Sequence, residues 1–186
     1  MESLHKMLVI TQLARELAAR GSWCGETHLQ KATYLLQEIA GVDTGFEFVL
    51  YRHGPFSFDL RDQLTYLRGL GLLELQPQEI PYGPKLLPTD SAQALAQKLP
   101  RTLARYQSQI TFAADAVRDR SVAELEPLAT ALYFTKQSGF PKAVSARAEK
   151  ISEVKPHISR DRGRRAVGEV DKLIESAKKL KATTRN

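Results

Sequence analysis

The feature that most restricts the fold is the order of apolar repeats and breakers along the first hundred residues. From residue 2 to 20, and again from 27 to 40, apolar side chains recur every three or four positions, which is the spacing of one helix face. Gly21 and Gly41 follow these segments, where glycine commonly ends a helix. The sequence therefore predicts two amphipathic helices, with Thr27 as the N-cap of the second.

The segment that follows carries a strand signal and then a helix signal. Residues 46–51 are rich in aromatic and β-branched side chains and predict a strand. Gly54 and Pro55 predict a turn after it. Ser57 can then cap a third helix, whose leucines recur on one face.

Two further short strands are predicted beyond this helix. Residues 72–75 and 85–87 have strand-like patterns, and the segment 76–84 between them holds three prolines and a glycine. Thr89 then caps a fourth helix. Three helices, a strand, a turn-rich tip and a second strand are the element order of a winged helix-turn-helix. We expect a mainly α protein whose residues 1–100 form a winged helix-turn-helix domain with a small β-wing.

The rest of the chain, residues 101–186, predicts a C-terminal helical region with a basic end. Ser121 and Glu124 have the spacing of a capping box at the start of one of its helices. Pro127 lies about two turns into that helix. We therefore expect the helix to be kinked there, or to begin near Glu126.

The net charge of +6 is unevenly distributed. Residues 1–140 carry 14 Lys/Arg and 15 Asp/Glu, whereas residues 141–186 carry 13 Lys/Arg and 6 Asp/Glu. A concentrated positive region attracts polyanions such as nucleic acid through counterion release. The alternative is a solvated tail that only increases solubility.

Several classes of protein do not fit the sequence. A single cysteine, Cys24, cannot form a disulfide within the chain. The sequence begins without the pattern of a signal peptide, and no apolar run approaches the ~20 residues of a membrane helix. The four histidines share no metal-ligand spacing, and His53 has no recognisable catalytic partners. We expect a soluble cytoplasmic protein that is not an enzyme, with no metal, no cofactor and no membrane association.

The most distinctive motifs lie between residues 28 and 75. They are HLQKATYLL at 28–36, YRHGPFS at 51–57 and LRGLGLL at 67–73. In these motifs the chain resembles the YwgA-type group of bacterial proteins and, more distantly, the Panacea domain of antitoxins. In the latter, a leucine-x-lysine helix also precedes a tyrosine-x-x-glycine-proline turn. The resemblance covers residues 1–100 and implies a winged-helix-like fold. It implies no single activity, because such groups include DNA-binding and toxin-neutralising members.

Candidate DNA contacts follow from the expected fold. The second helix of a helix-turn-helix enters the major groove, and here that helix opens at Ser57. The outward candidates on this helix and on the wing are Ser57, Arg61, Thr65, Arg68 and Lys85. Arg61 could donate two hydrogen bonds to guanine, and Ser57 could hold a phosphate. Asp59 and Asp62 on the same helix cancel its positive charge, so most of the affinity would come from elsewhere.

The C-terminal region supplies that second source of charge. Four arginines fall within six positions there, namely Arg160, Arg162, Arg164 and Arg165. Such a cluster can contact several phosphates, and each neutralised phosphate steepens the salt dependence of binding. The alternative is a charged outer helix face without a ligand.

Two functional hypotheses result. The first is a winged-helix regulatory protein that binds double-stranded DNA and is linked to phage defence or a toxin–antitoxin system. The second is an antitoxin or adaptor module that binds the product of a neighbouring gene and does not read DNA. The apolar stripes between residues 101 and 137 are interpreted as core or as the contact of a homodimer.

Overall fold

A computed structural model describes residues 2–79, 83–139 and 141–183 of the chain. This part is mainly helical, as expected, with two small antiparallel sheets of two strands each. The chain divides into two compact units, of which the first comprises Met1–Phe48 and Ser57–Arg120, and the second Val49–Phe56 and Ser121–Asn186. This division differs from the expected boundary at residue 100, because the helix after that boundary belongs to the first unit and residues 49–56 belong to the second.

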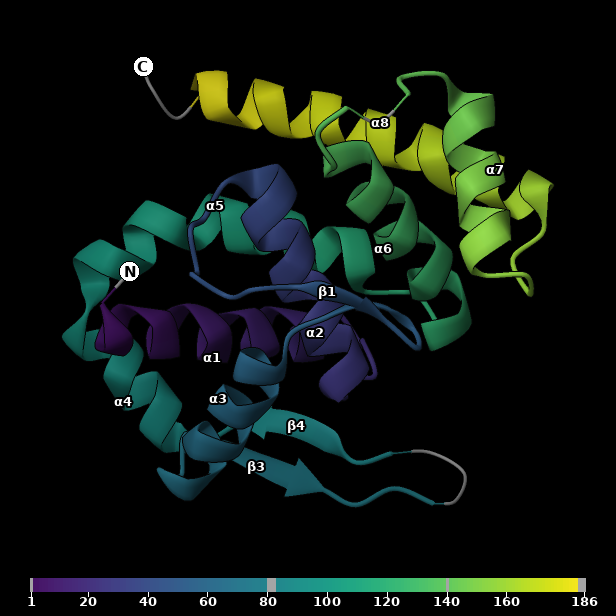
Figure 1. The fold of residues 1–186 in the computed structure, drawn as a ribbon. Helices are drawn as coiled ribbons and strands as arrows, with labels where there is room; N and C mark the ends of the chain where they lie inside the picture. The colour runs from purple at the N-terminus through teal and green to yellow at the C-terminus, as the bar shows by residue number, and fades with distance from the viewer. Residues whose placement is uncertain (1, 80–82, 140, 184–186) are drawn as a thin grey trace. The chain divides into compact units, whose positions relative to one another are not determined.

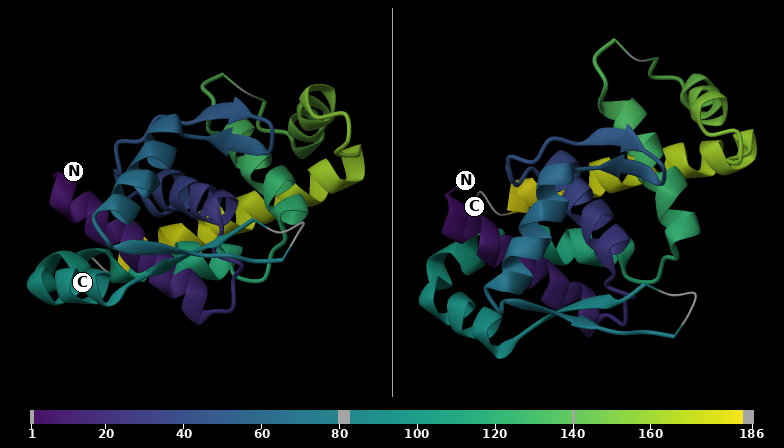
Figure 2. Two further views of the ribbon diagram at one scale, coloured as in Figure 1. Left: turned by 90° about the horizontal axis from the view of Figure 1, so that it is seen from below. Right: turned by 60° about the horizontal axis from the view of Figure 1, so that its bottom comes forward.

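The elements of the two units are shown in Figures 1 and 2. The first unit contains α1 (Ser3–Ala19), α2 (Glu26–Leu35) with the π-helical turn η1 (Leu36–Ala40), α3 (Phe58–Gly69), β3 (Leu73–Gln76), β4 (Lys85–Pro88), α4 (Asp90–Lys98) and α5 (Pro100–Val117). The second contains β1 (Val49–Tyr51), β2 (Gly54–Phe56), α6 (Val122–Lys136), α7 (Val144–Val154) and α8 (Arg160–Thr183).

Helix α1 is the centre of the first unit. It packs against α2, α4, α5 and β4, and every residue from 7 to 14 is buried. A helix that is buried on all sides contributes apolar area to several neighbours at once. The amphipathic pattern in the sequence therefore describes only part of its buried surface.

The start and the end of the second helical segment differ from the sequence prediction. Gly25, rather than Thr27, holds the N-cap position of α2, so no side chain caps this helix. The α-helix ends at Leu35 and continues as one π-helical turn up to Gly41, whose φ of 79° lies in the left-handed region. Glycine occupies this region without the strain that a Cβ would add.

The strand expected over residues 46–51 is shorter in the structure. Only residues 49–51 pair, in β1, with β2 as the antiparallel partner. Phe46 is buried, and the Phe48 ring lies 4.9 Å from the Tyr34 ring. Residues 46–48 therefore use their apolar side chains to pack on the first unit and make no strand pairing.

Two expected helix caps are confirmed in the first unit. The Ser57 hydroxyl accepts a hydrogen bond from the backbone N–H of Leu60 at 3.2 Å, at the start of α3. The Thr89 hydroxyl accepts from the N–H of Ala92 at 3.4 Å, at the start of α4. Each cap satisfies a backbone donor that the helix itself leaves unpaired.

Strands β3 and β4 form a hairpin, and the segment from Gly83 to Leu86 is held against the loop between α1 and α2. The backbone N–H of Leu86 donates to the carbonyl of Cys24 at 2.9 Å, and the Cys24 thiol donates to the carbonyl of Leu86 at 3.2 Å. The Trp23 indole N–H donates to the carbonyl of Gly83 at 3.1 Å. The expected turn-rich tip at 76–84 includes residues 80–82, which lie outside the described residues.

In the second unit, α7 and α8 form the most extensive helix pair, and β2 packs against α6. The buried guanidinium of Arg147 on α7 makes two hydrogen bonds, of 2.8 and 2.7 Å, with the two carboxylate oxygens of Asp171 on α8. Bidentate pairs of this kind fix orientation as well as adding energy.

No helix in the described part of the chain is both long enough and apolar enough to span a bilayer.

Helix α6 excludes one of the two alternatives expected for Pro127, namely a start near Glu126. The helix begins at Val122, and Pro127 lies inside it rather than at its start. The capping box is confirmed, since the Glu124 carboxylate accepts from the backbone N–H of Ser121 at 2.8 Å. Proline has no N–H, so the carbonyl of Ala123 loses its usual donor four residues on. The Arg162 side chain donates to that carbonyl at 2.9 Å and replaces the missing hydrogen bond.

This replacement leads to a stability prediction. Arg162→Ala is expected to lower the free energy of unfolding by about 1 kcal/mol, because the Ala123 carbonyl loses its side-chain donor. In a Pro127→Ala background the backbone N–H returns, so the same substitution should have little effect. Urea unfolding of the wild type, the two single variants and the double variant measures the difference. An equal loss in both backgrounds would show that Arg162 does not replace the hydrogen bond that Pro127 removes.

Candidate nucleic-acid interface

The solvent-facing side of α3 is divided lengthwise into two stripes of different chemistry. Arg61, Thr65 and Arg68 are spaced four and three residues apart and so share one stripe, which we call the basic stripe. Asp59, Asp62, Tyr66 and the C-cap Leu70 follow the same spacing on the other side. Both acidic residues of α3 lie on this second stripe. Asp62 nevertheless pairs with Arg61, so the charge of Arg61 is compensated as the sequence suggested.

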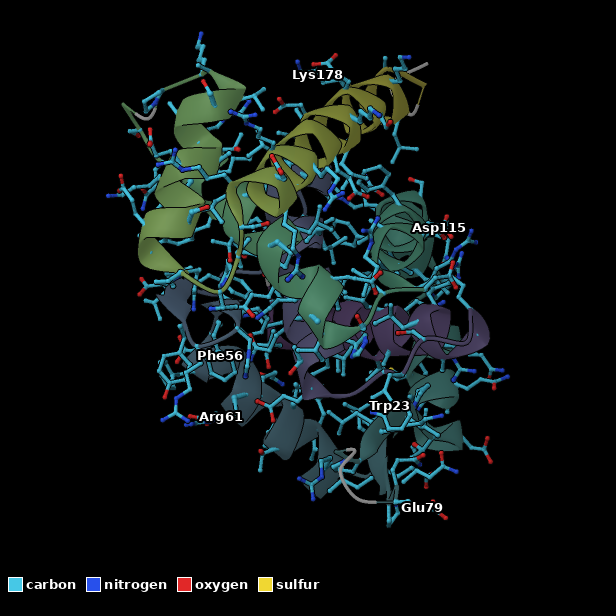
Figure 3. All side chains as sticks on the ribbon, turned by 90° about the vertical axis from the view of Figure 1, so that its right-hand side faces the viewer. Trp23, Phe56, Arg61, Glu79, Asp115 and Lys178 are labelled. Carbon is cyan, nitrogen blue, oxygen red and sulfur yellow. The ribbon has the colours of Figure 1, made fainter. Side chains whose placement is uncertain are left out.

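The three side chains of the basic stripe are exposed. Arg61 donates from Nε and Nη2 to one carboxylate oxygen of Asp62, both at 3.0 Å, and lies over the Phe58 ring. Its side chain extends outward from α3 in Figure 3. Exposed ion pairs of this kind contribute less than ~1 kcal/mol, so a phosphate or a base edge can replace Asp62. Arg68 makes no ion pair with any described residue.

The basic stripe borders a groove between α3 and the β3–β4 hairpin. The groove has a volume of about 650 Å³, and its lining includes Thr65, Arg68, Glu74, Leu75 and Thr89. Figure 1 shows the hairpin running beside the C-terminal half of α3 and extending beyond it. A rod-like ligand that follows α3 would therefore also meet the hairpin. Glu74 is the one acidic side chain among the described residues that line the groove.

Ser57 does not belong to this surface. Its side chain is fully buried, and its hydroxyl caps α3. The Gln30 side chain also holds its backbone, donating to the Ser57 carbonyl at 2.8 Å and accepting from its N–H at 2.9 Å. The expectation that Ser57 holds a phosphate is therefore corrected, because the group that would bind the phosphate is enclosed and already paired.

Lys85 stands at the start of β4, on the hairpin as expected. Its ammonium group lies 5.1 Å from the centre of the Trp23 ring, within the range of a cation–π contact. Figure 3 shows Trp23 beside the hairpin. Sequence reasoning missed Trp23 as part of this surface, because only the three-dimensional structure brings the α1–α2 loop against β4.

The four C-terminal arginines all lie on α8, but they have different surroundings. Arg160 pairs with Glu149 at 2.9 Å, and Arg162 donates to the carbonyl of Ala123. Arg162 is thus a structural residue rather than a phosphate contact. Arg164 and Arg165 are exposed and form no ion pair with the described residues. The second unit as a whole carries 15 Lys/Arg and 8 Asp/Glu, against 12 and 13 in the first.

The second stripe of α3 was also missed at the sequence level. Tyr66 and Leu70 on this stripe are 53% and 46% exposed, and Phe58 at the start of α3 is 43% exposed. Leu75 on β3 is 38% exposed. The sequence contained a signal for them. Tyr66 and Leu70 are four residues apart and lie off the helix face that the buried leucines of α3 occupy. Aromatic and apolar residues of this kind are enriched in protein–protein interfaces.

Three basic side chains of the second unit lie around one buried carboxylate. Glu126 on α6 has a side chain only 8% exposed. Its oxygens lie 3.5 Å from the Lys155 ammonium, 3.1 Å from His157 Nε2 and 3.6 Å from His53 Nδ1. Glu126 is therefore the partner of His53, the histidine in the turn between β1 and β2. Among the described residues no group of three or more His, Cys, Asp and Glu side chains is arranged to hold a metal ion.

His28, the first residue of the motif at 28–36, is a buried side chain of the first unit. Its Nε2 lies 3.0 Å from the carbonyl oxygen of Arg120, which can only accept, so Nε2 carries the proton. Its Nδ1 is buried without a hydrogen-bond partner among the described residues. Burial lowers the pKa of His28, an effect that the hydrogen bond to Arg120 partly opposes.

A pH dependence of stability follows from this lowered pKa. Below the ordinary histidine value of about 6.5, the unfolded chain binds a proton that folded His28 resists, so stability is lost as the pH falls. We expect His28→Gln to reduce the loss of unfolding free energy between about pH 7 and pH 5 by about 1 kcal/mol. Urea unfolding at both pH values tests this. An identical pH dependence in the variant would contradict it.

Comparison with known proteins adds no family to this description. No protein-family model matches the chain, and no curated protein sequence matches it significantly.

Proposed function

We propose that the protein binds double-stranded DNA as a winged-helix protein, with α3 directed at the major groove and the β3–β4 hairpin as the wing. The order α1, α2, α3, β3, β4 within the first unit supports the proposal. The observation that carries it is the basic stripe of α3 along the groove beside that hairpin. A recognition helix and an adjoining wing are the parts of a winged-helix protein that contact a duplex.

The charge distribution suggests different roles in DNA binding for the two units. The first unit is close to neutral, so its contacts would select position and sequence more than they add affinity. The second unit has seven more basic than acidic residues and exposes Arg164 and Arg165 on α8. It would supply the salt-dependent attraction to phosphate. We place the protein among regulators in toxin–antitoxin or phage-defence systems and propose no catalytic activity.

Replacing Arg68 tests the role of the basic stripe. We expect Arg68→Ala to raise the Kd for a fluorescently labelled duplex about tenfold, because one arginine contact to a base or phosphate is removed. Arg105→Ala on α5, also an exposed arginine, is the matched control and should change the Kd less than about twofold. Equal Kd values for the two variants in anisotropy titrations would remove α3 from the interface.

A protein-binding module is the second candidate, and the second stripe of α3 favours it. Phe58, Tyr66 and Leu70 offer exposed apolar area next to Asp59 and Asp62. This candidate predicts that the wild-type protein co-purifies with the product of a neighbouring gene and that Tyr66→Ala weakens the complex. DNA affinity that depends on Arg68, without any such complex, would exclude it.

A further inference from the structure

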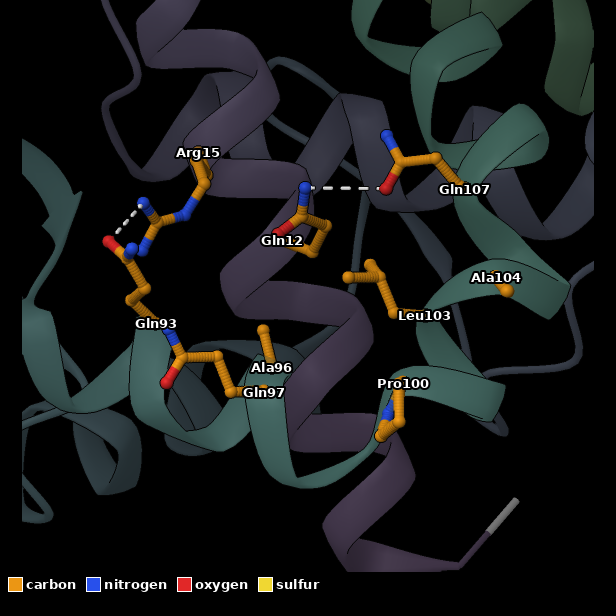
Figure 4. A pocket seen from close by; sticks show the side chains of 9 residues that line it. All are labelled: Gln12, Arg15, Gln93, Ala96, Gln97, Pro100, Leu103, Ala104 and Gln107. Atoms are coloured by element: carbon orange, nitrogen blue, oxygen red, sulfur yellow. Dashed lines mark hydrogen bonds between the residues drawn. The ribbon is translucent and has the colours of Figure 1, made fainter.

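The first unit contains a groove between α1, α4 and α5 that the proposed function does not use (Figure 4). Its volume is about 510 Å³, inside the range of roughly 300–1,000 Å³ that small-molecule sites occupy. The apolar part of its lining is formed by Ala96, Pro100, Leu103 and Ala104. The polar part is formed by Gln12, Arg15, Gln93, Gln97 and Gln107.

Arg15 is the one charged side chain among the nine described residues that line this groove. It is half-buried, and its Nη1 donates to the amide oxygen of Gln93 at 3.3 Å. No carboxylate of a described residue lies within ion-pair distance of it. A guanidinium has five N–H donors and binds carboxylates through two parallel hydrogen bonds. The groove therefore presents an uncompensated cation with spare donors.

Gln12 supplies an acceptor in the same groove. Its side chain is buried, and its nitrogen donates to Glu16 at 3.1 Å and to Gln107 at 3.4 Å. The Gln107 nitrogen donates to the same Glu16 oxygen at 2.7 Å, so Glu16 fixes both amides. With its nitrogen engaged, Gln12 offers its oxygen, which Figure 4 shows turned away from Gln107.

We propose that this groove binds a small carboxylic acid that carries a neutral N–H donor beside the carboxylate and an apolar body, as an N-acylated apolar amino acid does. Arg15 holds the carboxylate, the Gln12 oxygen accepts from the N–H, and the apolar body covers Pro100 and Leu103. A free ammonium group is disfavoured, because none of the described lining residues is acidic. The same chemistry occurs at the C-terminal residue of a peptide. The site does not depend on DNA binding.

The test uses the full-length chain and three related probes. N-acetylleucine carries all three features, N-acetylleucinamide lacks the carboxylate, and 4-methylpentanoate lacks the N–H donor. In ¹H–¹⁵N spectra, N-acetylleucine should shift the side-chain amide signals of Gln12 and Gln107 in a saturable way. The other two should bind at least about tenfold more weakly. A peptide that ends in the same leucine distinguishes the sources, because tighter binding than N-acetylleucine assigns the groove to a peptide C-terminus and equal binding assigns it to the free acid.

Two variants connect the binding to this groove. Arg15→Met keeps the aliphatic stem and removes the charge, so it should weaken N-acetylleucine at least about tenfold. Ala104→Trp fills the groove without changing Arg15 and should abolish binding; Ala104 is exposed, so the larger side chain does not disturb the core. Arg105→Met, outside the lining, should leave binding unchanged. The absence of saturable shifts, equal binding of the amide, or binding retained in both groove variants would overturn the proposal.

Discussion

Replacing Lys155 by methionine is expected to lower the free energy of unfolding by about 3 kcal/mol. The side chains of Lys155 and Glu126 are 11% and 8% exposed, and the two lie 3.5 Å apart. The Lys155 ammonium also donates to the carbonyls of Tyr51 and Arg52, the first at 2.6 Å. Methionine has a similar shape but no charge, so the variant leaves a buried carboxylate without its ammonium partner and two carbonyls without their donor.

A matched lysine provides the control for this prediction. Lys150 on α7 pairs with Glu153 at 3.1 Å, but both side chains are largely exposed. Lys150→Met should therefore change the free energy of unfolding by less than about 0.5 kcal/mol. Glu126→Gln combined with Lys155→Met should recover part of the loss, because the uncompensated charge is then removed as well. Urea unfolding that gives the same stability for the two lysine variants would show that Glu126 and Lys155 do not form a stabilising pair.

Replacing Arg164 and Arg165 together should have the largest effect on the salt dependence of DNA binding. Both are exposed on α8 and form no ion pair with the described residues, so their charge is available to phosphate. Each neutralised phosphate contributes about 0.9 to the slope of log K against log salt. We expect the double alanine variant to bind a duplex about tenfold more weakly at low salt and to show a slope shallower by about 2.

The double variant needs a control with the same change in net charge. Arg101 and Arg105 are exposed on α5, and replacing both by alanine also removes two positive charges. This control should keep the wild-type salt slope. Alanine favours helix, so α8 should remain helical in the double variant, and circular dichroism checks this. If both double variants weaken binding equally, net charge alone explains the attraction and α8 is not a specific phosphate contact.

Local signals were enough to predict much of the fold. The caps at Ser57 and Thr89 and the capping box at Ser121 each depend on residues within three positions, and all three are confirmed. The strand pair at 73–76 and 85–88 also follows from short patterns on each side of a proline-rich tip. These predictions succeed because the interactions that decide them are close in sequence.

The remaining features depend on residues far apart in the chain. Ser57 is buried because Gln30, 27 positions away, pairs with its backbone. Pro127 lies inside α6, and the carbonyl that its missing N–H leaves unpaired accepts a hydrogen bond from Arg162, 39 positions from Ala123. Residues 49–56 join the second unit through contacts of β2 with α6 and through the hydrogen bonds of Lys155 with the carbonyls of Tyr51 and Arg52. No short pattern contains these pairings.

The candidate interface shows the same limit. Arg61, Thr65 and Arg68 were identified from helical spacing alone, and the structure places all three at the surface on one stripe. The sequence analysis treated Asp59 and Asp62 as cancelling the charge of this helix. In the structure Asp62 does pair with Arg61, whereas Arg68 forms no ion pair with any described residue. Trp23 could not be assigned to the hairpin surface, because its contact with Gly83 joins residues 60 positions apart.

If the protein binds duplex DNA as proposed, the basic stripe of α3 and the β3–β4 hairpin contact the duplex. Titration of the ¹⁵N-labelled protein with a short duplex, followed by amide chemical shifts at low and at moderate salt, examines both elements at once. We expect salt-sensitive shifts concentrated in residues 58–69 and 73–88, with further shifts near Arg164. Shifts that avoid both segments of the first unit, or no shifts at low salt, would contradict the proposal.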